Sequence, residues 1–126
     1  MSFLGRYSEI AYALMRAVMA FLFMSHGYQR VLTGPWFPPD FPPLGVANVL
    51  EVIFGPLIFL GLFTPIAAFI ASGEMAVAYF LAHVPRGGLL PLFNMGEITV
   101  ALCFGFLYIA TRGGGRYSLD AMMGRN

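Results

Sequence analysis

The sequence predicts an all-α integral membrane protein, a bundle of four transmembrane helices that forms one domain over residues 1–126. Composition is the first reason, because 59% of the residues are hydrophobic and only 10% are charged, whereas a soluble domain carries about 25% charged residues. The second reason is four apolar segments, roughly residues 9–32, 46–63, 65–84 and 95–111. Each can cross most or all of a hydrocarbon layer of about 30 Å.

The first segment is expected to be a retained helix rather than a signal peptide, because Arg16 interrupts it and no small-x-small cleavage site follows. The proline-rich stretch LTGPWFPPDFPPLG separates the first two helices, and its Trp36 suits a membrane interface. The turn LFTP comes next, and Pro65 starts the third helix. HVPRGGLLPLF separates the last two helices, and residues 112–126 form a short tail.

The arginines predict the orientation. With four spans both termini lie on one side, together with Arg6, Arg112, Arg116 and Arg125, while Arg30 and Arg86 lie on the other. Because cytoplasmic loops carry the excess of basic residues, both termini are expected in the cytoplasm, with the protein in the inner (cytoplasmic) membrane.

Composition also excludes several kinds of site. The net charge is only +1, so the chain lacks the basic face of a nucleic-acid-binding protein. Cys103 is the single cysteine, which rules out an internal disulfide and a Cys-x-x-Cys redox or zinc site. No metal site is expected, and no flavin, haem or iron–sulfur motif occurs.

The two long loops share a pattern that suggests a duplicated helical hairpin. In the first half His26 and Arg30 precede a proline-rich loop and then Asn48-x-x-Glu51. The second half has the matching residues His83, Arg86 and Asn94-x-x-Glu97.

Helical spacing places the polar residues of each segment on one stripe, which we expect to face the interior. The four stripes are Glu9, Arg16, Phe23 and Arg30; Asn48, Glu51 and Gly55; Ala67, Ala71, Glu74 and Ala78; and Glu97, Ala101, Phe104 and Tyr108. An unpaired charge at the membrane centre costs at least about 2.5–3.5 kcal/mol. Arg16 and Glu74 start from the same side at similar depths, so they are predicted to form a buried ion pair.

At the opposite end His26, Glu51, His83 and Glu97 are candidate ligand-binding residues. Their imidazole and carboxyl groups could hydrogen-bond the carbonyl oxygens of a quinone and exchange its protons. A divalent metal is a weaker alternative, because no HxxxH or ExxH spacing is present. The competing structural interpretation is that each Asn-x-x-Glu motif is a capping box at a helix start.

Several stretches, in this order, resemble the DoxX family of small four-helix membrane proteins. They are Arg16 followed by SHGYQR, then EVIFGPLIFLGLFTPIAA, MAVAYFLAH, PLFNMGE and GGGRYSLD. Arg30 stands where the family commonly has lysine, which keeps the charge. The family is named after a membrane subunit linked to thiosulfate:quinone oxidoreductase and a terminal quinol oxidase, and other members are tied to oxidative stress.

The resemblance implies a quinone-linked role carried by Arg16, Glu51, Glu74, His83 and Glu97. The leading expectation is an accessory subunit of an electron-transfer complex in the lipid bilayer, docked to a larger membrane complex or to copies of itself. The alternatives are a stand-alone quinone-binding oxidoreductase component that uses the His/Glu cluster, and a small transporter or proton conduit.

Overall fold

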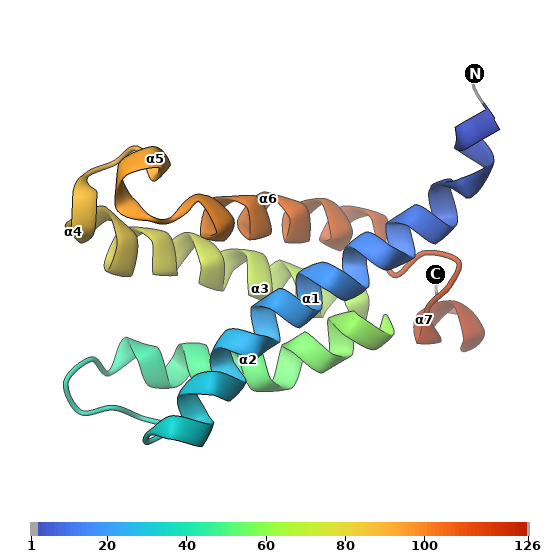
Figure 1. Cartoon of the computed structure of the whole chain (residues 1–126). Helices are drawn as coiled ribbons and strands as arrows, with labels where there is room; N and C mark the ends of the chain where they lie inside the picture. The colour runs from blue at the N-terminus through green and yellow to red at the C-terminus, as the bar shows by residue number, and fades with distance from the viewer. Residues whose placement is uncertain (1–2, 126) are drawn as a thin grey trace.

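The computed structural model describes residues 3–125, and the regular structure of this part of the chain is entirely helical. Four longer helices, α1 (Ser8–Thr33), α2 (Pro43–Leu60), α3 (Thr64–Ala78) and α6 (Glu97–Arg112), make up most of it (Figure 1). The shorter elements are a 3₁₀ helix (Phe3–Tyr7), a π-helical segment (Tyr79–His83), α4 (Val84–Gly87), α5 (Pro91–Asn94) and α7 (Leu119–Met122).

The longer helices form two antiparallel hairpins. α1 packs along α2, and α3 packs along α6 (Figure 1). Contact between α2 and α3 joins the hairpins, and a smaller contact between α1 and α6 lies on the other side. This arrangement agrees with the two hairpins expected from the repeated motifs, while the duplication itself stays a prediction.

Within residues 3–125, three helical stretches are long and apolar enough to cross a membrane. They are Phe3–Thr33, Pro43–Leu60 and Thr64–Gly87, with α3 continuing through the π-helical segment and α4. The 16 residues of α6 extend over about 24 Å. The all-α, membrane-type architecture is therefore confirmed, and the crossing of the membrane by the fourth helix stays a prediction.

Helix ends differ from the predicted ones for identifiable reasons. α2 begins at Pro43 rather than 46, because proline is accepted in the first turn of a helix. It ends at Leu60 rather than 63, because Gly61 adopts the left-handed conformation at φ 74° and Leu62 N–H donates to Leu57 O over 2.8 Å. α3 begins at Thr64 and has Pro65 in its first turn, as predicted.

The core lies where the two hairpins meet. Its fully buried side chains include Phe23, Ile58 and Phe106, and the rings of Phe23 and Phe106 pack edge to face at 5.1 Å. Small residues on α3, among them Ala67 and Ala71, are buried as the stripe predicted and let the helices approach closely.

The interior face predicted for α6 is wrong. Phe104 and Tyr108 are exposed, as are Glu97 and Ala101. The buried face of α6 consists of Thr99, Leu102, Phe106 and Ile109. The prediction placed Glu97 inside because of its charge, but Glu97 begins the helix, where a carboxylate can remain exposed.

Candidate functional site

The best-defined polar group lies between the ends of α1 and α2 that are far from the termini. Glu51 is only 3% exposed and forms an ion pair with Arg30, whose Nη2 atom donates a hydrogen bond to Glu51 Oε1 over 2.5 Å. Arg30 also donates from Nε to Asn48 Oδ1 over 2.6 Å. Asn48 in turn donates to the carbonyl oxygen of Trp36 over 2.8 Å. One arginine thus neutralises a buried carboxylate, and the asparagine ties both to the loop between the helices.

Gly27 allows α1 and α2 to approach closely at this group. A Cβ atom added at Gly27 would lie 2.7 Å from Glu51 Cβ and 3.3 Å from Glu51 Oε1. Real Cβ atoms essentially never come as close as the first of these distances. The glycine therefore lets Glu51 sit directly against the backbone of α1.

Glu74, on α3, extends the group across to the second hairpin. Its carboxyl group lies within hydrogen-bonding reach of that of Glu51. Its Oε1 atom is buried and has no hydrogen-bond partner among residues 3–125. Glu74 thus brings a buried acceptor with spare bonding capacity to the boundary between the hairpins.

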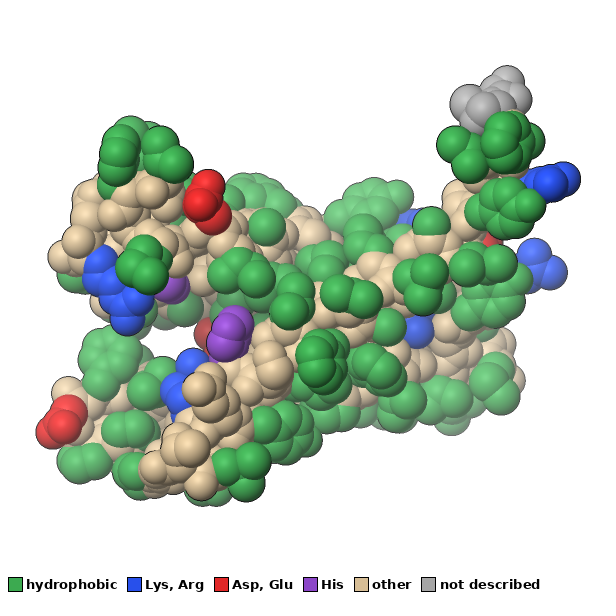
Figure 2. Space-filling model, viewed as in Figure 1, with side chains coloured by type: hydrophobic (Ala, Val, Ile, Leu, Met, Phe, Trp, Pro, Cys, Tyr) green, Lys and Arg blue, Asp and Glu red, His purple; other side chains and the backbone are tan. Residues whose placement is uncertain are grey.

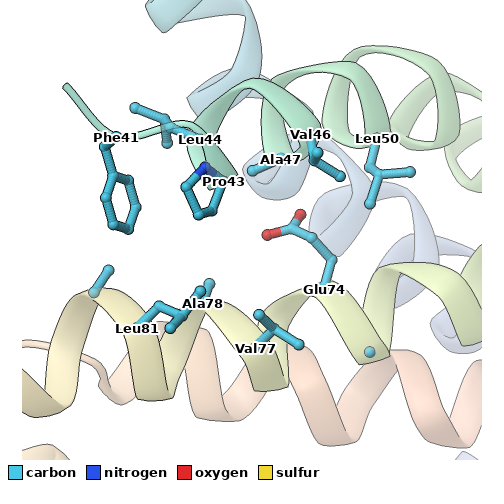
Figure 3. Close-up of a pocket in the computed structure, with 12 residues that line it drawn as sticks. Phe41, Pro43, Leu44, Val46, Ala47, Leu50, Glu74, Val77, Ala78 and Leu81 are labelled. Atoms are coloured by element: carbon cyan, nitrogen blue, oxygen red, sulfur yellow. The ribbon is translucent and has the colours of Figure 1, made fainter. Parts of the chain in front are cut away.

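That boundary contains a cavity of about 520 Å³ between α2 and α3. The carboxyl group of Glu74 points from α3 towards α2, and the labelled side chains around it are apolar (Figure 3). The lining residues are Phe41, Pro43, Leu44, Val46, Ala47, Leu50, Gly73, Glu74, Val77, Ala78, Leu81 and Ala82. Glu74 is the only ionisable residue in this lining, so the site offers one polar contact in an otherwise hydrophobic space.

The structure assembles only part of the predicted His/Glu cluster. His26 is exposed on α1, directly before Gly27, where the backbone of α1 lies against Glu51. Figure 2 shows a histidine among acidic and basic side chains around the hollow end of the molecule. Glu97 is exposed at the start of α6, and within residues 3–125 no hydrogen bond or ion pair joins it to this group.

His83 belongs to a second polar group, within the α3–α6 hairpin. Its Nδ1 atom lies 3.2 Å from Asn94 O, and its Nε2 atom lies 3.2 Å from Thr99 Oγ1. Asn94 is fully buried, donates to Gly88 O and Tyr79 Oη over 2.9 Å each, and accepts from Gly96 N. Both ring nitrogens of His83 thus have partners inside their own hairpin.

The capping-box interpretation is wrong for the first motif. Asn48 and Glu51 lie inside α2, which begins five residues before Asn48, and both bond to Arg30. In the second motif Gly96 occupies the N-cap position of α6, and no side chain caps it. Asn94 instead accepts from Gly96 N and holds the preceding loop. The two asparagines therefore share a role, since each donates to a carbonyl of its own hairpin loop.

The predicted Arg16–Glu74 ion pair is wrong. Arg16 is 4% exposed and donates to four carbonyl oxygens, those of Ile58 (2.9 Å), Phe59 (3.3 Å), Gly114 (2.5 Å) and Tyr117 (3.1 Å). The N-terminal part of α1 extends past the other helices (Figure 1). The hydrogen bonds of Arg16 to Gly114 and Tyr117 place it at the level of the tail. Gly27, at the level of Glu51, is eleven residues or about 16 Å further along α1.

Asp120 completes this terminal network. It does not pair with Arg116, four residues before it. Its carboxylate accepts from the backbone N–H groups of Phe63 and Thr64, each over 2.8 Å, and lies 3.9 Å from Arg125. Burial alone would raise the pKa of Asp120, but the hydrogen bonds from Thr64 and Phe63 outweigh it and hold the pKa below its ordinary value. Ser118 caps the N-terminus of α7. The bonds of Asp120 therefore hold the tail against the turn between α2 and α3.

Sequence reasoning missed the cavity and the contact between the two carboxyl groups. The sequence did contain a signal for the Arg30 network. Asn48 and Glu51 are spaced to share one face of α2, and Arg30 lies near the end of the preceding helix. Nothing in the sequence showed that Glu74 faces Glu51. Among residues 3–125, no three His, Cys, Asp or Glu side chains converge as a metal site would require.

Comparison with known proteins identifies the family and supports the membrane assignment. The sequence profile of the DoxX family matches residues 11–84, which cover most of α1 and all of α2, α3 and the π-helical segment. A protein of Haemophilus influenzae described as uncharacterized is 40% identical over 128 residues, which cover 95% of this chain and 96% of that protein. No solved structure matches the chain. The profile match spans more than half of the sequence, so the chain belongs to the DoxX family of membrane proteins.

Proposed function

We propose that the protein is an accessory membrane subunit of a quinone-linked electron-transfer complex and that it holds a quinone or quinol in the cavity between α2 and α3. The observation that carries the proposal is the buried, unpartnered Oε1 atom of Glu74 beside an apolar cavity of about 520 Å³. A volume in the range of small-molecule sites, with apolar walls and few polar groups, suits a hydrophobic ring with a hydrogen-bonding oxygen.

Glu74 and Glu51 would contribute hydrogen bonding and proton exchange at one oxygen of the ligand. Two carboxyl groups in contact repel each other when both are ionised, and one shared proton removes that repulsion. Arg30 compensates the charge that remains on Glu51. The group is thus suited to giving or accepting one proton, while electrons would pass to a redox centre of the partner complex.

The proposal includes the orientation expected from the sequence, with four membrane spans, both termini in the cytoplasm and the protein in the inner membrane. The arginine-rich end of the molecule would then face the cytoplasm. The cavity, near the opposite end, would lie in the outer half of the bilayer. Partners would dock on the apolar outer faces of the helices, where many large side chains are exposed.

A transporter or proton conduit has less support. The polar groups near Arg16 and Glu51 are separated along α1 by about 16 Å. Buried apolar side chains, including Ala20, Phe23 and Ile58, occupy the interior between them. These three side chains offer no hydrogen-bonding groups to a chain of water molecules.

The test is quinone retention by protein purified from its native membrane in mild detergent, with the bound quinone extracted and quantified by chromatography. We expect the wild type to retain quinone, and Glu74→Leu and Ala47→Phe to lose it, because one removes the polar contact and the other fills the cavity. Glu97→Gln is the matched control, since it changes an exposed carboxylate and should retain quinone. Melting temperatures of all variants show whether each is folded.

A wild-type protein without quinone, or folded Ala47→Phe protein that retains it fully, would contradict the site. The accessory role has its own readout in the mass of the complex under gentle extraction. A mass that includes a larger oxidoreductase supports this role, and a chain that purifies alone with quinone bound favours a stand-alone component.

A further inference from the structure

A second groove runs along the outer surface of α3 and α6 near the end that carries the termini. Two hollows of about 340 and 380 Å³ form it, and they share the lining residues Pro65, Ile66, Ala110 and Thr111. Because these four residues belong to both hollows, the groove is continuous. It is distinct from the cavity beside Glu74, with which it has no lining residue in common.

The two ends of this groove differ in chemistry. Towards the middle of the helices its walls are Phe69, Ile70 and Leu107, and the exposed fractions of Ile66 and Phe69 are 66% and 64%. Towards the terminal end the lining includes Arg112, Arg125 and Asp120. On α6, Leu107 and Arg112 are five residues or about 8 Å apart, a length that covers a glycerol backbone and the first part of an acyl chain.

The carboxylates near the two arginines are themselves engaged by other donors. Arg112 pairs with Glu9 over 2.7 Å, but Glu9 also accepts from Arg116 N over 3.1 Å. Arg125 lies 3.9 Å from Asp120, whose oxygens already accept from two backbone N–H groups. Each guanidinium has five N–H donors, so both arginines keep donors for a further anion.

The whole terminal end is also positively charged. Among residues 3–125 it carries five arginines, Arg6, Arg16, Arg112, Arg116 and Arg125, against two acidic side chains, those of Glu9 and Asp120. Basic side chains gather at the end with both termini in Figure 2. Arginine binds phosphate oxygens through paired, charge-assisted hydrogen bonds, and basic residues at a membrane surface attract anionic lipid.

We propose that this groove is a binding site for an anionic glycerophospholipid. Arg112 and Arg125 bind its phosphate, and Phe69, Ile70 and Leu107 hold the upper part of an acyl chain. The proposal does not depend on the quinone site, because the two use different surfaces and different residues.

The test is native mass spectrometry of the detergent-purified protein with an equal mixture of phosphatidylglycerol and phosphatidylcholine that carry identical acyl chains. We expect the wild type to keep phosphatidylglycerol preferentially. Each arginine near an anionic lipid is worth about 1 kcal/mol, so Arg125→Gln should lower the preference about fivefold. The double variant with Arg112→Gln should lower it further.

Arg86→Gln is the matched control, because it removes the same charge at the opposite end of the molecule and should leave the preference unchanged. Phe69→Ser should weaken retention of both lipids equally and keep their ratio, and melting temperatures confirm that each variant is folded. Equal retention of the two lipids by the wild type would overturn the proposal, as would an effect of Arg86→Gln as large as that of Arg125→Gln.

Inorganic phosphate distinguishes a lipid site from a phosphate site, since both offer the same anion. We expect excess phosphate alone to leave the bound phosphatidylglycerol in place, because the acyl contacts are absent from the competitor. Displacement of the lipid by phosphate, together with no effect of Phe69→Ser, would identify a site for free phosphate instead.

Discussion

Arg16 provides the sharpest test of how the terminal end is held together. Replacing it by alanine removes a buried guanidinium that donates to four backbone carbonyls, on α2 and on the tail. A buried carbonyl oxygen without a hydrogen-bond donor destabilises the folded protein, because water reaches it poorly. The change therefore acts on the junction of three chain segments rather than on one ion pair.

The expected loss can be worked from these contacts. A hydrogen bond to a charged group is worth about 1.5–3 kcal/mol, and three of the four contacts are 3.1 Å or shorter. The contacts share one side chain and are not additive, so we expect Arg16→Ala to lower the free energy of unfolding by about 3–5 kcal/mol, less than the sum of the separate hydrogen bonds. Arg16→Lys should lose about half as much, because an ammonium group cannot reach carbonyls in several directions.

The assay is equilibrium unfolding in mixed micelles by titration with a denaturing detergent, followed by far-UV circular dichroism. Arg86→Ala is the control, since that side chain is exposed. A double-mutant cycle with Glu74→Gln then distinguishes the observed bonding of Arg16 to carbonyl oxygens from the predicted ion pair with Glu74. Groups more than about 10 Å apart should show a coupling energy within about 0.5 kcal/mol of zero. A loss below about 1 kcal/mol in Arg16→Ala, or a coupling of several kcal/mol, would refute the reasoning.

Two further changes test the other contacts. Gly27→Ala should lower the free energy of unfolding by about 1–3 kcal/mol, because its Cβ would lie 2.7 Å from Glu51 Cβ and push α1 away from α2. Gly73→Ala is the control, since no atom lies within 4 Å of the added Cβ. Equal effects of the two substitutions would count against the close packing at Gly27. The pKa of Asp120 is lower in the folded protein than in the unfolded chain. Its contribution to stability should therefore be full above the unfolded pKa near 4 and be lost as pH falls through the folded pKa. Asp120→Asn should flatten this acid dependence in thermal melts, and an unchanged profile would show that the contacts at the start of α3 contribute little.

Amino-acid pattern was sufficient to predict the helical membrane architecture, because hydrophobic content and span length depend only on composition along the chain. It also placed Arg16 and Phe23 on the buried face of α1, since helical periodicity fixes which residues share a face. Glu9 and Arg30, predicted on the same stripe, are partly exposed near the two ends of the helix. The pattern failed for α6, where the polar residue lies at the helix end and the true interior face is apolar.

The tertiary structure decided which buried polar residues contact each other. Arg16 and Glu74 have similar apparent depths when each is counted from its helix start, but α1 extends beyond the bundle and shifts Arg16 to the level of the tail. Glu74 instead faces α2, where it meets Glu51 and opens onto the cavity. The sequence by itself determined the helices, the charges they carry and the interior faces of α1 and α2, but not that of α6. Their relative displacement along the bundle depends on contacts between segments up to about a hundred residues apart, such as Arg16 with Gly114, which periodicity within one helix does not encode.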